Sequence, residues 1–142
     1  MERYLRILRE STRGRIALLK RVLESHGLNF LLLFEGDLVA SKITCSKHYN
    51  IVVVSARDDP VVLADQTLYD IAVEESPWDV VLIEDFSLEC IVSKLKRIMG
   101  RQEGGLRVGV NKSWGRTKIS FIYVDVLNVL AKEGFSVEDV TP

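Results

Sequence analysis

The chain has 142 residues and a formal net charge of -1, with 47% apolar and 27% charged residues. This length suits one domain with one continuous core and is too short for two. The composition is that of an ordinary globular protein, and the near-neutral charge excludes a general attraction to nucleic acid or to an acidic membrane surface.

The cysteines and the N-terminal sequence indicate the compartment. Cys45 and Cys90 lie far apart in the chain, without the neighbouring ligands of a disulfide framework or a zinc knuckle. The N-terminus carries charge every few residues, unlike a signal peptide, and no window reaches the roughly 18 apolar residues of a membrane span. We therefore expect a cytoplasmic protein with no membrane partner and no nucleic-acid partner.

An amphipathic helix is predicted from Ile16 to His26, followed by a buried strand from Asn29 to Phe34. The helix has apolar residues three and four positions apart, and Gly27 suits the left-handed backbone that ends a helix. The strand has no polar side chain after Asn29, which is typical of a central strand covered on both faces. Before the helix, Gly14 permits a break, so the preceding residues could form a separate helical turn or a flexible lead.

A hairpin is predicted next. Residues 49–54 and 61–64 are rich in β-branched side chains, and a turn containing Asp59-Pro60 separates them. This spacing favours two antiparallel strands. Residues 35–48, which precede the hairpin, are predicted to be irregular or to form a short helix.

Strands alternate with helices in the rest of the chain. The predicted helices are residues 67–74, 88–99 and 117–132, and the predicted strands are 79–83, 106–110 and 135–140. Ser87 is a natural N-cap for the second of these helices, and Gly100 is a natural stop.

These elements predict an α/β fold. A three-strand meander followed by βα units can form one mixed sheet with helices on both faces, because parallel crossovers need helices whereas antiparallel neighbours need only turns. We expect a three-layer α/β/α sandwich with a mixed sheet of five or six strands, of the ribonuclease H-like type. Residues 1–14 are assigned to an N-terminal lead or helical extension and residues 15–142 to the domain.

Histidine placement argues against a catalytic triad, because a nucleophile needs a base and an orienting group beside it. His26 and His48 are the two histidines of the chain. His26 lies at the end of a predicted helix, where an imidazole interacts favourably with the helix dipole. His48 opens a predicted strand, and a metal site built from it and Cys45 alone would lack ligands.

Carboxylates at strand ends allow a nuclease hypothesis. Glu35 and Asp37 follow the first strand, whereas Glu84 and Asp85 follow the strand at residues 79–83. If those strands were neighbours, the four acids could hold a divalent ion, as in a ribonuclease H-like nuclease. Acids are also common at helix starts, and the first strand contains none. We therefore rank a nuclease below other functions.

A basic cluster occupies the N-terminal segment. It contains Arg3, Arg6, Arg9, Arg13, Arg15, Lys20 and Arg21 against Glu2 and Glu10. Such a cluster can bind a nucleic acid or an acidic partner, but a solvated helix side is the commoner explanation, and we adopt it here.

The order of these motifs resembles the N-terminal domain of the creatinase, prolidase and aminopeptidase P family of Xaa-Pro peptidases. Members begin with an Arg-led amphipathic helix and a Gly-Leu-Asp-Ala-Leu-Leu-Val-like entry to the first strand, similar to Arg15-Ile16-Ala17-Leu18-Leu19 and Gly27-Leu28-Asn29-Phe30-Leu31-Leu32-Leu33. Later family motifs are similar to Leu63-Ala64-Asp65, Tyr69-Asp70-Ile71-Ala72, Arg107-Val108-Gly109-Val110-Asn111 and Phe135-Ser136-Val137-Glu138-Asp139-Val140. The similarity covers nearly all of residues 15–142.

Two segments depart from the family pattern. Residues 37–45 replace the Asn-Ile-Arg-Tyr-Leu-Thr-Gly-Phe-like segment that follows the first strand in the family. The Arg that often follows the Leu-Thr-Asp strand is missing from residues 65–69. Substrate contacts made through those family residues are therefore not carried over to this chain.

The resemblance implies a non-catalytic domain that covers an active site, restricts substrates to short peptides and supports dimerisation. In the family, a C-terminal pita-bread domain holds two divalent ions (Mn, Co or Zn), so no cofactor is expected in this segment, and its own enzymatic activity is left open. The implied partners are a second copy, a C-terminal catalytic domain and, in the parent enzyme, a peptide substrate.

We take His48, Tyr49, Asp65 and Tyr69 as candidate binding residues of this domain. The chain stops at Pro142, about where the second domain would begin, which suggests a segment of a longer peptidase. The alternative is a stand-alone peptidase-like module that recognises a protein or peptide.

Overall fold

The computed structural model describes residues 2–100, 106–110 and 121–140, which form helices and strands in alternation. The elements are α1 (Glu2–Ser25), β1 (Phe30–Phe34), α2 (Leu38–Thr44), β2 (Ile51–Ser55), β3 (Val61–Asp65), α3 (Tyr69–Glu75), β4 (Asp79–Ile83), α4 (Leu88–Met99), β5 (Arg107–Val110), α5 (Phe121–Lys132) and β6 (Ser136–Asp139). Each predicted strand is confirmed to within two residues at either end.

One six-stranded mixed sheet organises the domain, in the order β4-β3-β2-β1-β5-β6. The β1, β2 and β3 strands form the predicted antiparallel meander, with Leu32 opposite Val53 and Val52 opposite Val62. The β3–β4, β1–β5 and β5–β6 pairs are parallel, and each is joined through a helix or a longer connection. The predicted mixed α/β sheet is therefore confirmed.

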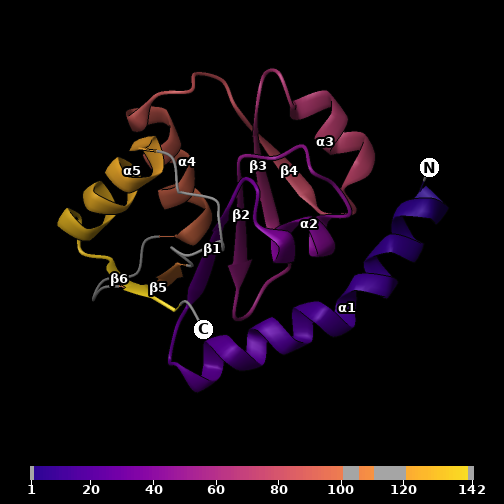
Figure 1. Cartoon of the computed structure of the whole chain (residues 1–142), viewed down its shortest axis with the longest axis horizontal. Helices are drawn as coiled ribbons and strands as arrows, with labels where there is room; N and C mark the ends of the chain where they lie inside the picture. The colour runs from indigo at the N-terminus through magenta and orange to yellow at the C-terminus, as the bar shows by residue number, and fades with distance from the viewer. Residues whose placement is uncertain (1, 101–105, 111–120, 141–142) are drawn as a thin grey trace.

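The two faces of the sheet bury separate cores. On one face α4 and α5 cover alternate residues of the central strands, including Leu32, Val53 and Val108. On the other face α1 and α2 cover the residues between them, including Leu31, Leu33 and Val52. Figure 1 shows these helix pairs on opposite sides of the sheet. The continuous apolar run of β1 is explained by this two-sided burial, since side chains of a strand alternate between faces.

The first helix is longer than predicted. It runs unbroken from Glu2 to Ser25, so the break allowed at Gly14 does not occur. Thr12, Ile16 and Leu23 are its buried residues, and the hydroxyl of Thr12 donates to the carbonyl of Leu8 at 3.0 Å. Figure 1 shows α1 passing along one edge of the domain with its N-terminal end extending beyond the sheet.

Local signals at two other helix ends behave as predicted. Ser87 caps α4 by accepting a hydrogen bond from the backbone N–H of Cys90 at 3.3 Å, and Gly100 follows the last residue with φ 77°. The helix predicted for residues 117–132 is observed as α5 from Phe121, and residues 117–120 lie outside the described part of the chain.

Close packing favours glycine at one position within the sheet. Gly109 lies in β5, as predicted, and a Cβ built there would come within 2.7 Å of Leu28 Cδ1 and 3.3 Å of Val140 Cγ2. Leu28 and Val140 therefore pack directly over the backbone of β5.

No helix in the described part of the chain combines the length and hydropathy needed to cross a membrane.

Candidate functional site

His48 lies in a hollow of about 330 Å³ beside the loop that joins α2 to β2. Its Nδ1 is 2.6 Å from Glu75 Oε1 at the end of α3, and the Ser46 hydroxyl donates to the same oxygen at 2.9 Å. The side chains of His48 and Glu75 are 43% and 40% exposed, so the pair remains accessible from solvent. The remaining lining residues are Ser41, Cys45 and Lys47.

The electrostatics of this hollow do not create a nucleophile. Hydrogen bonding to His48 lowers the pKa of Glu75, which favours its carboxylate form. Burial raises the pKa of the Cys45 thiol more than Arg15 lowers it, so the thiol stays protonated at neutral pH. Ser46 donates to Glu75 and accepts from the backbone N–H of His48 at 2.9 Å, so its hydroxyl stabilises the loop that precedes β2. The hollow is therefore suited to polar contact, not covalent catalysis.

Tyr49 lies behind the hollow and not within it. It is 1% exposed, and its hydroxyl is 2.9 Å from the Ser41 hydroxyl while donating to the carbonyl of Asp37 at 2.9 Å. Burial is the main cause that raises its pKa. Tyr49 thus holds α2 and the following loop in place from beneath.

Asp65 and Tyr69 lie at a different place, where β3 ends and α3 begins. The Asp65 carboxylate accepts from the backbone N–H groups of Thr67 and Leu68 at 2.9 and 3.1 Å, which shapes the turn into α3. Tyr69 is the half-buried first residue of α3. The hollow beside His48 includes neither of them, so the four predicted residues do not share one pocket.

The carboxylates of the nuclease hypothesis are not brought together. It required β1 and β4 to be neighbours, and this is wrong because β2 and β3 separate them. Asp37 instead caps α2, accepting from the N–H groups of Val39 and Ala40 at 2.8 and 3.1 Å. Glu84 pairs with Lys94 at 2.8 Å. Among the described residues no three Asp, Glu, His or Cys side chains could hold a metal ion.

A polar network joins the ends of β1, β2 and β3, and the sequence did not predict it. Asn50 accepts from the N–H of Asp65 at 2.7 Å and donates to Glu35 at 3.4 Å, so one side chain joins the ends of three strands.

The Tyr123 ring stacks on Phe34 with centroids 4.6 Å apart. Its hydroxyl is buried beside Asn50 and Glu35 but makes no well-formed hydrogen bond in the described part of the chain, and burial is the main cause that raises its pKa. Long-range contacts of this kind leave no local sequence signal.

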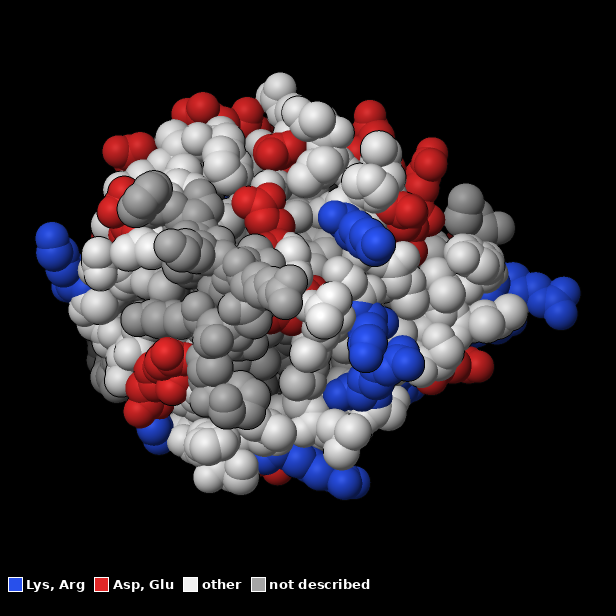
Figure 2. All heavy atoms as spheres, viewed as in Figure 1, with Lys and Arg blue, Asp and Glu red and all other residues white. Residues whose placement is uncertain are grey.

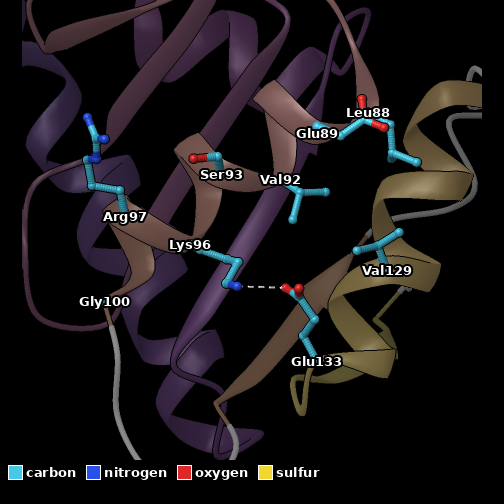
Figure 3. Close-up of a pocket in the computed structure, with 9 residues that line it drawn as sticks. All are labelled: Leu88, Glu89, Val92, Ser93, Lys96, Arg97, Gly100, Val129 and Glu133. Carbon is cyan, nitrogen blue, oxygen red and sulfur yellow. Dashed lines mark ion pairs between the residues drawn. The ribbon is translucent and has the colours of Figure 1, made fainter.

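A surface groove with a volume of about 640 Å³ lies between α4 and α5. Val92 and Val129 approach each other across it, and Lys96 Nζ pairs with Glu133 Oε2 at 3.0 Å (Figure 3). The groove lies between two helices of the same layer, and its lining is mixed: Leu88, Val92 and Val129 are apolar, whereas Glu89, Ser93, Lys96, Arg97 and Glu133 are polar or charged.

Charge is unevenly distributed over the surface. Figure 2 shows acidic side chains along the upper edge of the face in view, whereas lysines and arginines lie toward the lower and right edges, where Figure 1 places α1. The α1 sequence carries seven basic and three acidic side chains. A near-neutral net charge therefore conceals a basic helix on an otherwise acidic body.

Solved structures share this fold. No family model matches the chain, and no curated protein matches it. The N-terminal creatinase/prolidase-like domain of a proposed metallopeptidase from Corynebacterium diphtheriae has a TM-score of 0.70 and 14% identity over 93% of this chain and 98% of that one. The N-terminal domain of the cytoplasmic peptidase PepQ from Mycobacterium tuberculosis has a TM-score of 0.61 and 23% identity over 91% and 92%.

The chain also matches part of a longer protein. The prolidase of Pyrococcus furiosus matches with a TM-score of 0.57 and 15% identity, covering 86% of this chain and 31% of that one. Identities this low show a shared fold and no more. The sheet order, the two-sided core and these similarities together show that the chain has the fold of the N-terminal creatinase/prolidase-like domain of Xaa-Pro peptidases.

Proposed function

We propose that this chain is the non-catalytic N-terminal domain of a Xaa-Pro dipeptidase or aminopeptidase. In this role it covers the active site, limits the length of the substrate and supports dimerisation. The observation that carries the proposal is the fold match, which covers 98% of a solved N-terminal domain and 31% of a prolidase. Such a domain influences a reaction that another part of the polypeptide catalyses.

The reactive groups of the described residues support a non-catalytic role. His48 and Glu75 bind each other, Glu84 binds Lys94, and Asp37 caps a helix, so each performs a structural task. The metal ions that the family resemblance implies do not fit this domain, because its described side chains provide no three-ligand group. We therefore assign any metal-dependent step to a catalytic domain outside this segment.

His48 is the best placed of the four candidate residues for contact with a peptide. It is 43% exposed in a hollow, whereas Tyr49 is buried and the Asp65 carboxylate is occupied by the turn that follows it. A covering domain needs polar groups that meet a substrate without reacting with it, and an imidazole held by Glu75 meets this need.

The proposal is tested by the gene and by an assay. The reading frame after Pro142 should continue with the spaced Asp, Asp, His, Glu and Glu ligands of a pita-bread domain. The purified 142-residue chain should not hydrolyse a Xaa-Pro dipeptide with added Mn²⁺, while the longer product should. Removing residues 1–142 from that product should allow longer peptides to be cleaved. Hydrolysis by the short chain alone, in the absence of contaminating enzyme, would refute the proposal.

A second candidate function is a stand-alone peptidase-like module that recognises a protein or peptide. The α4–α5 groove, which combines apolar and charged lining residues with an accessible ion pair, favours it. A stop codon directly after Pro142 would support this module over the peptidase domain. Binding of a peptide that weakens when Lys96→Glu reverses the charge of an exposed groove residue, with Leu38→Glu as an exposed control away from the groove, would then locate the binding surface.

A further inference from the structure

Helix α1 exposes apolar side chains along one stripe. Tyr4, Ile7, Leu18 and Val22 are 56%, 53%, 59% and 45% exposed, although each is a large hydrophobic residue. Tyr4, Ile7 and Leu18 lie on the side of the helix away from buried Ile16 and Leu23, and Val22 lies at the border of this side, where it also lines a groove with Leu23. Exposed large hydrophobic residues are ordinary when scattered, but a continuous row of them marks a contact surface.

The stripe follows the helical period, with two large apolar residues toward each end and two small residues between them. At about 100° per residue, positions 4, 7, 11, 14, 18 and 22 fall within a stripe about 80° wide. Ser11 and Gly14, both exposed, occupy the middle of this stripe. The Ser11 hydroxyl donates to the carbonyl of Leu8 at 2.9 Å, so burying it would leave no donor unpaired. The stripe extends over about 27 Å of helix.

The spacing of the stripe is self-complementary in an antiparallel sense. Reversing the helix about a point between Ser11 and Gly14 places Ile7 opposite Leu18, and Tyr4 within one residue of Val22. The large apolar side chains then pair at both ends, while the two small residues meet where the helices cross. Small residues at a crossing let two helix backbones approach closely, and this pattern is what an isologous two-fold interface requires.

Charge favours the same direction. The first turns of α1 contain Arg3 and Arg6 against Glu2, which opposes the positive end of the helix dipole. The last turn contains no basic residue, and Glu24 lies there. An antiparallel neighbour would bring its negative end and its Glu24 close to Arg3 and Arg6, so each helix would offset the unfavourable charge of the other.

The helix is held in place by the domain, so the stripe is presented on a fixed surface. Arg9 donates through Nε to the carbonyl of Pro77 at 2.6 Å, and Thr12 is 1% exposed. These contacts anchor the N-terminal half of α1 beside the start of β4. Tyr4 and Ile7 are therefore held in a fixed position relative to Leu18 and Val22, although α1 bends between the two pairs (Figure 1).

We propose that α1 pairs antiparallel with α1 of a second copy of this chain, through Tyr4, Ile7, Leu18 and Val22 with Ser11 and Gly14 at the crossing. The inference rests on the dimerisation included in the proposed function and names its surface. The interface involves one helix from each copy, so it is at the small end of stable interfaces and predicts a concentration-dependent dimer.

Disulfide cross-linking tests the direction of pairing, using the full chain with Cys45 and Cys90 replaced by Ser. The double variant Ile7→Cys with Leu18→Cys should form a covalent dimer on mild oxidation, because a disulfide needs Cβ atoms about 4 Å apart. Either single variant should stay monomeric, since identical positions would be about 16 Å apart along antiparallel helices. Cross-linking of the single Leu18→Cys variant would show parallel pairing and overturn the inference.

Sedimentation measurements test the surface. Leu18→Glu should weaken the dimer at least about tenfold, whereas Leu38→Glu, at a 77% exposed apolar residue off the stripe, should leave it unchanged. A dimer that Leu18→Glu does not weaken would overturn the α1 pairing while leaving the dimerising role intact. A chain that is monomeric at all concentrations would overturn the pairing as well, and the peptidase assignment would still depend on the separate hydrolysis assay.

Discussion

His48 Nδ1 and Glu75 Oε1 lie 2.6 Å apart and join the loop before β2 to the end of α3. The two residues are 27 positions apart in the chain, so the contact holds together segments that have no local reason to meet. It also defines the wall of the hollow in which His48 is presented. A substitution that breaks the His48–Glu75 pair should therefore lower the stability of the fold and change the shape of the hollow.

The stability contribution of Glu75 should depend on pH. Its pKa is lowered in the folded state, chiefly by the hydrogen bond to His48, so folding favours the carboxylate. The contribution is then complete above the unfolded pKa of about 4.3 and disappears as the pH falls through the lower folded value. Glu75→Gln should cost about 0.2–1 kcal/mol at pH 6, a small value because the pair is partly exposed, and less at pH 3.

Urea denaturation of both proteins at the two pH values measures this effect. His48→Ala serves as the control, because it removes the partner and should make a further Glu75→Gln change nearly neutral at pH 6. An equal cost of Glu75→Gln at pH 3 and pH 6 would mean that the carboxylate does not contribute through its charge.

The two buried tyrosines should respond differently to loss of their hydroxyl groups. Tyr49→Phe should destabilise the protein by about 1 kcal/mol, because it removes hydrogen bonds to Ser41 and to the Asp37 carbonyl. Tyr123→Phe should cost less, because the buried Tyr123 hydroxyl lies beside Asn50 and Glu35 without a well-formed hydrogen bond in the described part of the chain. Thermal unfolding of both variants gives the comparison. A Tyr123→Phe cost equal to that of Tyr49→Phe would reveal a bound water or another partner.

Local patterns in the sequence predicted the elements and their order, because each depends on residues close in the chain. The apolar stripe of α4, its Ser87 cap and its Gly100 stop are all signals of this kind, and each is confirmed. Glycine at position 14 was treated as a possible break, yet burial of Ile16 and Leu23 keeps α1 continuous. Packing on the domain outweighs the roughly 1 kcal/mol that a glycine costs within a helix.

The candidate site was predicted only in part, since its contacts depend on the order of strands. His48 was selected from its position, but its partner Glu75 belongs to another helix. The acids at positions 37 and 84 were read as a possible cluster because strand order is not visible in a single sequence. The sheet separates β1 from β4. Asp37 instead caps α2, and Glu84 instead pairs with Lys94.

Two glycines should give opposite results when replaced by alanine. Gly109→Ala should cost about 1–3 kcal/mol, because its Cβ would lie 2.7 Å from Leu28 Cδ1 in a packed layer. Gly14→Ala should stabilise the protein by about 0.5–1 kcal/mol, because it lies within a helix with nothing within 4 Å of the added Cβ. Denaturation should be followed at low protein concentration, so that pairing of α1 does not contribute. A neutral Gly109→Ala would show that Leu28 can move aside without loss.

Asp37 should behave as a helix cap and not as a metal ligand. Asp37→Ala should lower the stability by about 1 kcal/mol, because two backbone N–H groups of α2 lose their acceptor. Asp37→Asn should cost much less, since asparagine caps helices about as well as aspartate does. Addition of Mg²⁺ or Mn²⁺ should change the melting temperature of neither the original chain nor these variants. If either ion stabilised the original chain but not the Asp37→Asn variant, the carboxylate would be acting on a cation and the capping explanation would be insufficient.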